Sequence, residues 1–416
     1  MRQILISVVA VLMVIVIFKL IPVSVTGQSP EAIAEFGSPA DTSLKTSWGD
    51  PDLQGIWTHD SEVPLQRPPS LGDRLFFTEE EVAELDELRA KRLDHDYRAP
   101  VGTPNDVSGA YNAVFHLRKP TGLRTSLIID PPDGQMPAYL PRVLEERAIL
   151  QEFRWALLQA SPACKNKERS CDGHEYGPIS PKFDEPAPIY GRGGVNRSDG
   201  PEDHGMATRC LAGFLPAGGE GTTFSSGQNG FSRLIVQTRD GITMHYDTGQ
   251  GQGWQRHIVM NGSPHLPDNV RQWWGDSRGH WEGDTLVIDV TNFSPKTSIF
   301  GGNENVHLVE RFTRTGPETL EYIVTMEDPT TWERPWTVMV EYTKQDDSAN
   351  RFYIEPRCHE GNYGLPGLLA GARAEDKAYA EGEGPHPATI CTSGCSEKLE
   401  APEFETINPL GAGYGY

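Results

Sequence analysis

The sequence predicts a mainly β protein in which an antiparallel, lipocalin-like barrel is accompanied by peripheral helices. Between residues 232 and 356 the chain is a series of short segments in which apolar and polar residues alternate, as they do in half-buried strands. Hairpin-type turns join these segments, and no long helical crossover separates them. A single antiparallel meander that closes on itself makes a barrel. A two-sheet β-sandwich is the main alternative.

The first 27 residues have the organisation of a secretory signal peptide. Arg2 precedes an apolar run over residues 4–18, and small residues lead to a cut after Gly27. The alternative is an uncleaved membrane anchor, although Lys19 and Pro22 interrupt the apolar segment. Cleavage would make the mature protein periplasmic or secreted, and we expect no membrane span later in the chain.

The chain is strongly acidic, with 37 Lys and Arg against 58 Asp and Glu and a formal net charge of −21. Removing residues 1–27 removes two cations and no anion, which leaves 35 basic residues and a charge of −23. Such a surface repels phosphate backbones and anionic lipid headgroups, so we expect no nucleic-acid partner. A content of 33 Pro and 43 Gly predicts long irregular connections.

Six cysteines in an exported chain are expected to form disulfides. We favour the connectivity in which close neighbours pair and the other two join: Cys164 with Cys171, Cys391 with Cys395, and Cys210 with Cys358. Other connectivities stay open, since sequence alone does not fix pairing. No two cysteines have the Cys-x-x-Cys spacing that would indicate a zinc site.

Residues 28–230 are predicted to be a loop-rich region whose two helices wrap the core. The first helix starts at Thr78, whose hydroxyl can cap the amide of Glu81 while the Glu81 carboxylate reaches back, and runs to residue 93. A strand is expected at 125–129. The second helix begins at Pro141, which suits a first helical turn, and continues to residue 159.

We place the barrel domain at residues 231–373 and a peripheral tail at 374–416. Eight strands are expected, at residues 232–237, 242–246, 255–260, 285–290, 306–313, 319–326, 336–342 and 351–355. The turns between them, such as Glu282-Gly283-Asp284, fit hairpins.

Several longer strings in the chain form a recognisable set. They are PDLQGIW (51–57), RTSLIIDPPDG (124–134), WEGDTLV (281–287), ERFT (310–313), EDP (327–329), RPWT (334–337) and CHEGNY (358–363). Together they resemble a large, uncharacterised family of exported bacterial proteins, over roughly residues 48–373. The resemblance implies export and a shared architecture but no activity. The chain departs from the family at 246–256, where three glycines lengthen a turn, and in the loop at 164–171.

Polar residues on the predicted barrel and its rim are candidates for catalysis. His245, His257, His359 and Glu360 could hold a divalent metal with a position open for water. We do not favour a metal, because the spacing matches no metal-binding motif, and no other cofactor is indicated. If 359 and 360 continue a strand, they point to opposite faces, so only one could join a shared site.

Glu310 is the candidate general acid, because it lies on the same strand face as Leu308 and Phe312. A carboxyl among apolar neighbours either stays protonated or is neutralised by a partner such as Arg311 or Arg334. An ion pair is the more common outcome. His307 would face away from Glu310.

Trp254, Trp273 and Trp274 are candidates for the apolar walls of a ligand site, with plugs of the barrel end as the alternative. We predict an exported barrel that binds a small, partly apolar organic ligand at its mouth. An enzyme remains the alternative, either a hydrolase or lyase with a His/Glu site, with or without a metal, or a carbohydrate-active protein that uses the tryptophans and two carboxylates. The sequence does not decide between binding and catalysis.

Overall fold

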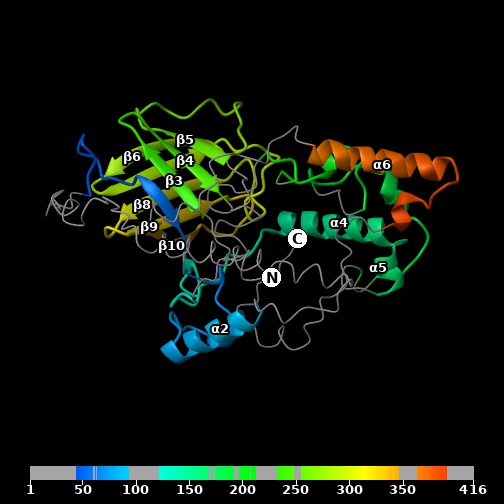
Figure 1. Ribbon diagram of the computed structural model, residues 1–416, viewed down its shortest axis with the longest axis horizontal. Helices are drawn as coiled ribbons and strands as arrows, with labels where there is room; N and C mark the ends of the chain where they lie inside the picture. The colour runs from blue at the N-terminus through cyan, green and yellow to red at the C-terminus, as the bar shows by residue number, and fades with distance from the viewer. Residues whose placement is uncertain are drawn as a thin grey trace, which may run out of the picture. The chain divides into compact units, whose positions relative to one another are not determined.

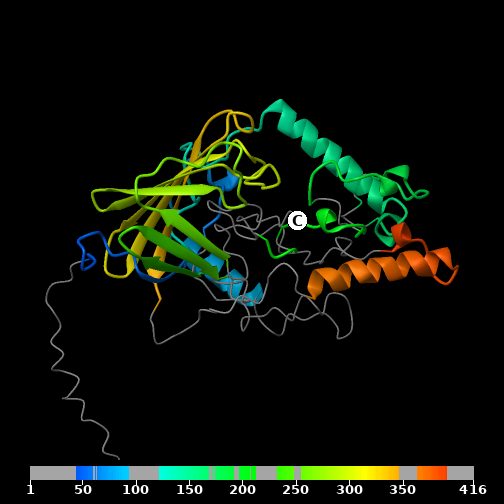
Figure 2. The ribbon, with the colours of Figure 1, turned by 90° about the horizontal axis from the view of Figure 1, so that it is seen from above.

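The computed structural model describes residues 44–59, 61, 63–92, 121–167, 171, 174–191, 196–206, 208–211, 232–247, 254–345 and 363–390. Within this part of the chain nine strands form a closed barrel, in the order β1-β3-β4-β5-β6-β7-β8-β9-β10, and β10 pairs with β1 to close the ring (Figures 1 and 2). The ring strands are β1 (Gly55–Thr58), β3 (Ser232–Gln237), β4 (Gly241–Asp247), β5 (Trp254–Val259), β6 (Asp276–Glu282), β7 (Thr285–Thr291), β8 (His307–Arg314), β9 (Thr319–Glu327) and β10 (Trp336–Lys344). The predicted barrel is confirmed, and the sandwich alternative is wrong.

The predicted strands from 232 to 342 are present with ends within two residues of the expected ones. The predicted strand at 351–355 lies outside the described residues. Two ring strands were not predicted. The first is β1, which comes from the segment interpreted as an extended lead-in and pairs with β3 and β10. The second is β6, whose inward-facing Gly279 leaves no room for a side chain against Met260 and Ile258.

The expectation of a wholly antiparallel sheet is wrong at one seam. Strand β5 pairs with β6 in parallel through Val259 and Arg278, whereas the other ring pairs are antiparallel. The connection at 260–275 is long enough to carry the chain back along the barrel before β6 begins, as a parallel pair requires. The short strand β2 (Ile128–Asp130) pairs with β10 beyond the closed ring.

Alternate residues of the strands face the interior, which is why the sequence alternates. Strand β9 illustrates the pattern, because Leu320, Tyr322, Val324 and Met326 are buried and the residues between them are partly exposed. Trp57 of β1 is fully buried in the same cluster, and its indole N–H donates to the Leu53 carbonyl at 2.8 Å. Burial of such side chains is the main stabilising contribution to the barrel.

Both predicted helices are present, as α2 (Glu79–Arg92) and α4 (Pro141–Leu158). The expected capping box is formed: the Glu81 amide donates to the Thr78 hydroxyl at 3.2 Å, and the Thr78 amide donates to the Glu81 carboxylate at 2.8 Å. No described side chain of α2 or α4 belongs to the core of the barrel. The start of α4 is held to the β9–β10 connection, since the Leu140 amide donates to the Thr331 carbonyl.

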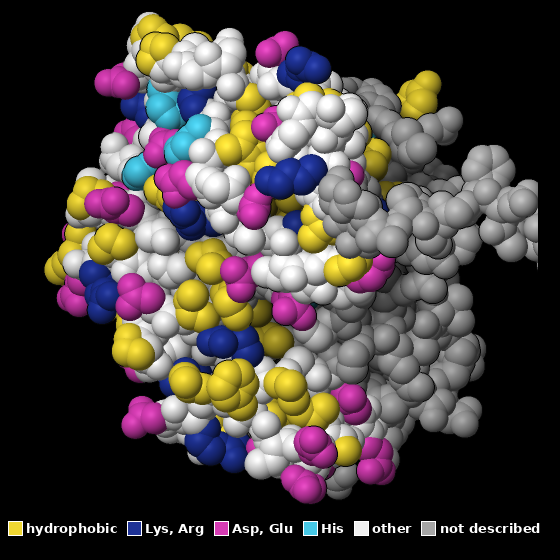
Figure 3. Space-filling view, turned by 90° about the vertical axis from the view of Figure 1, so that its left-hand side faces the viewer, with side chains coloured by type: hydrophobic (Ala, Val, Ile, Leu, Met, Phe, Trp, Pro, Cys, Tyr) yellow, Lys and Arg dark blue, Asp and Glu magenta, His cyan; other side chains and the backbone are white. Residues whose placement is uncertain are grey.

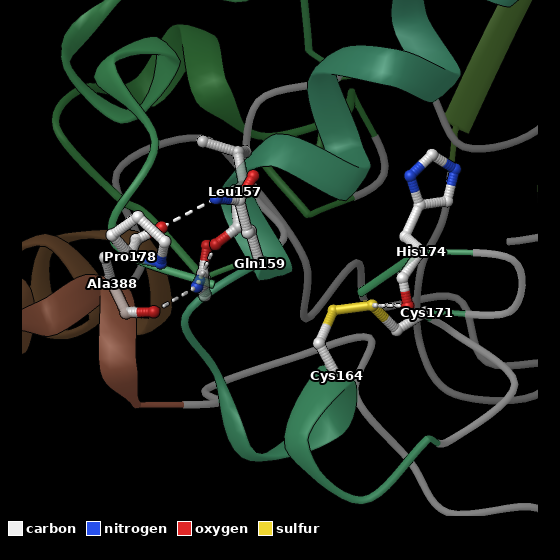
Figure 4. Close-up of a disulfide and its surroundings, with 8 residues drawn as sticks. Leu157, Gln159, Cys164, Cys171, His174, Pro178 and Ala388 are labelled. Carbon is white, nitrogen blue, oxygen red and sulfur yellow. Dashed lines mark hydrogen bonds between the residues drawn. A yellow bond between two sulfur atoms is a disulfide. The ribbon is translucent and has the colours of Figure 1, made fainter. Parts of the chain in front are cut away.

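The far end of α4 contributes to a second, smaller core. Phe153, Leu157 and Leu158 pack with Phe183, Ala388 and the Cys164–Cys171 disulfide. Figure 4 shows the disulfide together with Leu157 and Ala388. This disulfide was predicted and is confirmed, with its Cα atoms 5.0 Å apart. Cys210 is also disulfide-bonded, to a partner outside the described residues. The pairs Cys210–Cys358 and Cys391–Cys395 stay predictions, since Cys358, Cys391 and Cys395 lie outside the described residues.

Three further features complete the described chain. The short helix α5 (Pro162–Lys165) carries Cys164, and four 3-10 turns are present: η2 (Pro69–Leu71), η5 (Pro181–Asp184), η6 (Pro201–Asp203) and η7 (Pro387–Thr389). Helix α6 (Gly364–Ala380) contacts η7 and was not predicted. None of the helices described is both long enough and apolar enough to cross a membrane.

Candidate functional site

The barrel interior contains a polar cluster within its apolar wall. Its members face inward from seven strands and are all at least nine-tenths buried: Arg233, Tyr246, Arg256, Ser277, Glu310, Tyr322 and Tyr342. We call this set the interior polar cluster. Ser277 apart, each residue shares its strand face with a buried apolar residue two places away, as Arg233 does with Ile235 and Arg256 with Ile258.

Glu310 forms an ion pair with Arg256 in the centre of this cluster. The side chains of Arg256 and Glu310 are 2% and 1% exposed. The Tyr322 hydroxyl donates to the other Glu310 oxygen at 2.8 Å, and Arg256 Nε donates to the Ser277 hydroxyl at 2.9 Å. Burial works to lower the pKa of Arg256, but Glu310 and Tyr246 outweigh it and raise the pKa above its ordinary value. Glu310 is thus neutralised by an arginine, as expected, but not by Arg311 or Arg334.

Arg233 is the second buried cation, and aromatic rings surround it. Its guanidinium carbon lies 4.3 Å from the ring centroid of Tyr342, 5.0 Å from that of Tyr322 and 5.4 Å from that of Tyr246. Burial works to lower the pKa of Arg233, yet the three tyrosines and Glu310 raise it overall. Burial raises the pKa of Tyr342 to about 12, and the nearby Arg233 opposes that rise. Arg233 therefore stays charged and Tyr342 stays protonated at neutral pH.

Three donors of the cluster have no hydrogen-bond partner among the described residues: Arg233 Nη1, Arg256 Nη1 and the Tyr342 hydroxyl. A buried donor without an acceptor is destabilising, so such groups are uncommon in folded proteins. The charges are also unequal, because the cluster holds two guanidinium groups and one carboxylate. The described interior thus has one positive charge and three hydrogen-bond donors in excess.

Trp273 and Trp274 lie in the 260–275 connection and pack against the barrel core. The Trp274 ring is 5.2 Å from the ring of Tyr246, a member of the interior polar cluster. Asn292 fixes this connection, since its side-chain amide donates to the carbonyls of Leu266, Pro267 and Val270 at 2.9–3.2 Å. The side chain of Trp254 lies outside the described part of the structure.

The two described histidines of the predicted site, His245 and His257, do not face the barrel interior. Met244 and Ile258 face inward, so their neighbours His245 and His257 are on the outer face of the sheet, with Thr243 Oγ1 3.3 Å from His257 Nδ1. The inward–outward alternation that predicted an inward-facing Glu310 also predicts that His245 and His257 face outward. Neither can meet Glu310 around a shared ligand. The remaining candidates, His359 and Glu360, lie outside the described residues.

A different histidine network, which the sequence analysis missed, crosses the outer face of β6 to β9. His265 contacts Asp276 at 2.8 Å and Asp289 at 2.7 Å, and His307 contacts the other Asp289 oxygen at 2.8 Å. Glu327 lies 3.8 Å from His307 Nδ1. Figure 3 shows histidine side chains gathered among acidic and basic ones on one face of the molecule. Because His265 comes from the 260–275 connection, the network joins that connection to the barrel wall.

The charges of this network are set by its contacts. The hydrogen bond from His307 lowers the pKa of Asp289, and the same contact raises the pKa of His307. Burial works to raise the pKa of Asp276, but hydrogen bonds from Arg278, the Leu266 amide and His265 lower it overall. All the carboxylates are therefore occupied by donors, and the described residues include no group of three His, Cys, Asp or Glu side chains placed to hold a metal ion.

The carboxylates on either side of Gly283, which were candidates for the glycoside-hydrolysis alternative, are both engaged by cations. Glu282 forms an ion pair with Arg311, and Lys45 Nζ donates to Asp284 at 2.6 Å. Trp273 and Trp274 pack against the barrel core. These placements leave the interior polar cluster as the strongest site in the described structure.

Comparison with known proteins adds little. No family model and no curated protein matches the chain. A secretory abundant heat soluble protein from Ramazzottius varieornatus is similar over 29% of this chain and 74% of its own, at 12% identity and a TM-score of 0.21. The wild-type fluorescent protein UnaG is similar over 30% of this chain and 77% of its own, at 14% identity and a TM-score of 0.19. The fold assignment therefore rests on the strand pairing itself.

Proposed function

We propose that this barrel binds a small, partly apolar organic ligand whose polar group reaches the interior polar cluster. The observation that carries the proposal is the pair of buried, unpartnered donors on Arg233 and Tyr342. Each unmatched donor costs roughly 1–3 kcal/mol in the unliganded protein. A ligand that supplies acceptors removes this cost, and the surrounding aliphatic and aromatic wall favours an apolar body.

Binding is favoured over catalysis by the state of Glu310. Both of its oxygens are engaged, one by Arg256 and the other by Tyr322. A general acid or base needs a reacting group within hydrogen-bond reach and a change of protonation during the reaction. The Glu310 carboxylate is instead fixed between Arg256 and Tyr322, which suits a rigid recognition site.

Tyr342→Phe tests the proposal, because it removes one unmatched hydroxyl and keeps the ring. Binding of the neutral dye Nile red, followed by its emission, should be saturable with one site per chain. The variant should weaken binding about three- to tenfold, the size of one net hydrogen bond. It should leave the unliganded protein as stable as the wild type or more stable, since an unsatisfied group disappears.

Tyr379→Phe is the matched control, since Tyr379 is half-exposed on α6. This variant should change neither binding nor stability. Absence of saturable binding to the wild-type protein would contradict the proposed function. A Tyr342→Phe variant that is destabilised but binds normally would show that the hydroxyl has a structural role only.

We also propose that the protein is exported, with residues 1–27 removed. The signal-like N-terminus and the two disulfide-bonded segments support this, since disulfides persist in oxidising compartments. Terminal sequencing of the protein from its native cells should start at Gln28. Non-reducing peptide mapping should join Cys210 to Cys358. A start at Met1 would indicate the uncleaved anchor instead.

A further inference from the structure

We infer that the ligand carries a single negative charge on a carboxylate-like group, and that Arg233 is its counterion inside the barrel. This inference rests on the proposed ligand-binding function and adds to it the chemical class of the ligand. Three features of the interior polar cluster support it: its charge balance, the existing partners of Arg256, and the positions of the unpartnered donors.

Among the described residues of the barrel interior, one positive charge is left without an anion. Arg233 and Arg256 are both 3% exposed, and Glu310 is the one carboxylate in the interior polar cluster. A guanidinium stays protonated in proteins, so it cannot lose its charge on burial. Buried charges are stable when an opposite charge accompanies them. A monoanion brings the cluster to neutrality, whereas a dianion such as phosphate would leave it negative.

Arg233, and not Arg256, is the cation that lacks a counterion among the described residues. Arg256 contacts Glu310 and Ser277, so its charge is matched within the protein. Arg233 lies over the rings of three tyrosines and forms no ion pair with a described residue, although Glu310 is near enough to contribute to its raised pKa. Ring faces attract a cation but give it no formal counter-charge and no acceptor for its N–H groups. An ionised carboxylate would provide both.

The remaining donors are arranged for one acidic group. Arg233 Nη1 and the Tyr342 hydroxyl are both unpartnered within the described chain, and the Arg233 guanidinium is 4.3 Å from the Tyr342 ring. Each carboxylate oxygen can accept one of these two hydrogen bonds. Since burial keeps the Tyr342 hydroxyl protonated, with a pKa of about 12, it acts as a donor over the physiological range.

The test uses two probes that differ in one group, decanoate and decanamide. Calorimetric titration of the full mature chain at pH 7 should show that decanoate binds at least about tenfold more tightly than decanamide, as a charge-assisted contact requires. Arg233→Met should abolish this preference by weakening decanoate binding while decanamide binding changes little. Arg239→Met is the matched control, because Arg239 is exposed in the turn between β3 and β4.

The outcomes separate this inference from the proposed function. If Nile red itself does not bind saturably, the proposed function fails and the inference fails with it. If Nile red binds but neither decanoate nor decanamide binds or displaces it, the proposed function stands and the inference is overturned. If both probes bind equally to the wild-type protein, the proposed function stands and the inference is overturned. If the preference survives in Arg233→Met, the anion is bound elsewhere and the inference is overturned.

Arg233→Lys gives a second test should the methionine variant not fold. It keeps the charge but not the planar fork, so decanoate should bind less tightly than to the wild type and still more tightly than decanamide. If Arg233→Lys binds decanoate as tightly as the wild type does, the role of the guanidinium geometry is overturned. If Arg233→Lys binds decanoate and decanamide equally, the role of charge is contradicted.

Discussion

Replacing Glu310 by Gln isolates the contribution of the buried ion pair, because Gln keeps the size of Glu and removes its charge. The substitution leaves Arg256 buried without a counterion, and both side chains are at most 2% exposed, so solvent does not screen the loss. Breaking such a pair from one side destabilises a protein by about 3–5 kcal/mol. A typical domain has only about 5–15 kcal/mol of stability, so the effect should be large.

The assay is urea unfolding at pH 7, followed by tryptophan fluorescence. Glu282→Gln is the matched control, because its ion pair with Arg311 is 40–49% exposed and screened by solvent, so its loss should change the free energy of unfolding little. The double variant Arg256→Met/Glu310→Leu leaves no stranded charge, so it should cost less than the two single changes added together. A loss for Glu310→Gln no larger than that for Glu282→Gln would refute this reasoning, and so would a fully additive double variant.

Three further predictions concern other parts of the chain. His307→Asn should lower the free energy of unfolding by under about 1 kcal/mol, because the pair with Asp289 is over a third exposed. This contribution is fully present below pH 6.5 and is lost as pH rises through the raised His307 pKa. The difference in unfolding free energy between wild type and variant should therefore be larger at pH 6 than at pH 9, and an equal difference at both pH values would contradict the prediction. Replacing both Cys164 and Cys171 by Ala should lower the free energy of unfolding by about 2–3 kcal/mol, the loop-closure value for their separation of 7, with little change in Nile red affinity. Trp274→Ala should weaken Nile red binding, since its ring packs on Tyr246, while Trp155→Ala serves as the control.

Local pattern was enough to predict most of the barrel, because alternation is a property of each strand by itself. Strands β7 to β10 follow from it directly. Strand β1 did not, since its four residues are stabilised by pairing with β3 and β10, which are far away in the sequence. In β6 the inward Gly279 breaks the apolar alternation. Helix α6 starts with glycines and a proline, the residues with the lowest helix propensity, and none of its side chains is buried.

The site was predictable in part, for the same physical reason. The apolar neighbours of Glu310 indicated that it faces inward and needs a partner, and both statements are confirmed. The partner was sought among arginines close in sequence or in motif, whereas Arg256 reaches Glu310 from a strand three places away around the ring. Arg233 and Arg256 also share a face with apolar residues. Applying one rule to every charged residue in a strand would have identified both.

The outer charge of the protein and its interior charge have opposite signs, which makes the inferred binding reaction dependent on salt. The mature chain would carry −23 overall, while the interior polar cluster has one positive charge in excess. An approaching anion is repelled by the surface, and at 0.1 M salt this repulsion is screened beyond about 10 Å. The contact with Arg233 is shielded from solvent, so salt should affect it far less. Stopped-flow measurements should therefore show decanoate association becoming faster between low and physiological salt, with a nearly constant dissociation rate, and decanamide association unaffected. Slower association of decanoate at higher salt would mean that the entrance is positively charged, and the ligand would then be drawn in by a surface outside the interior polar cluster.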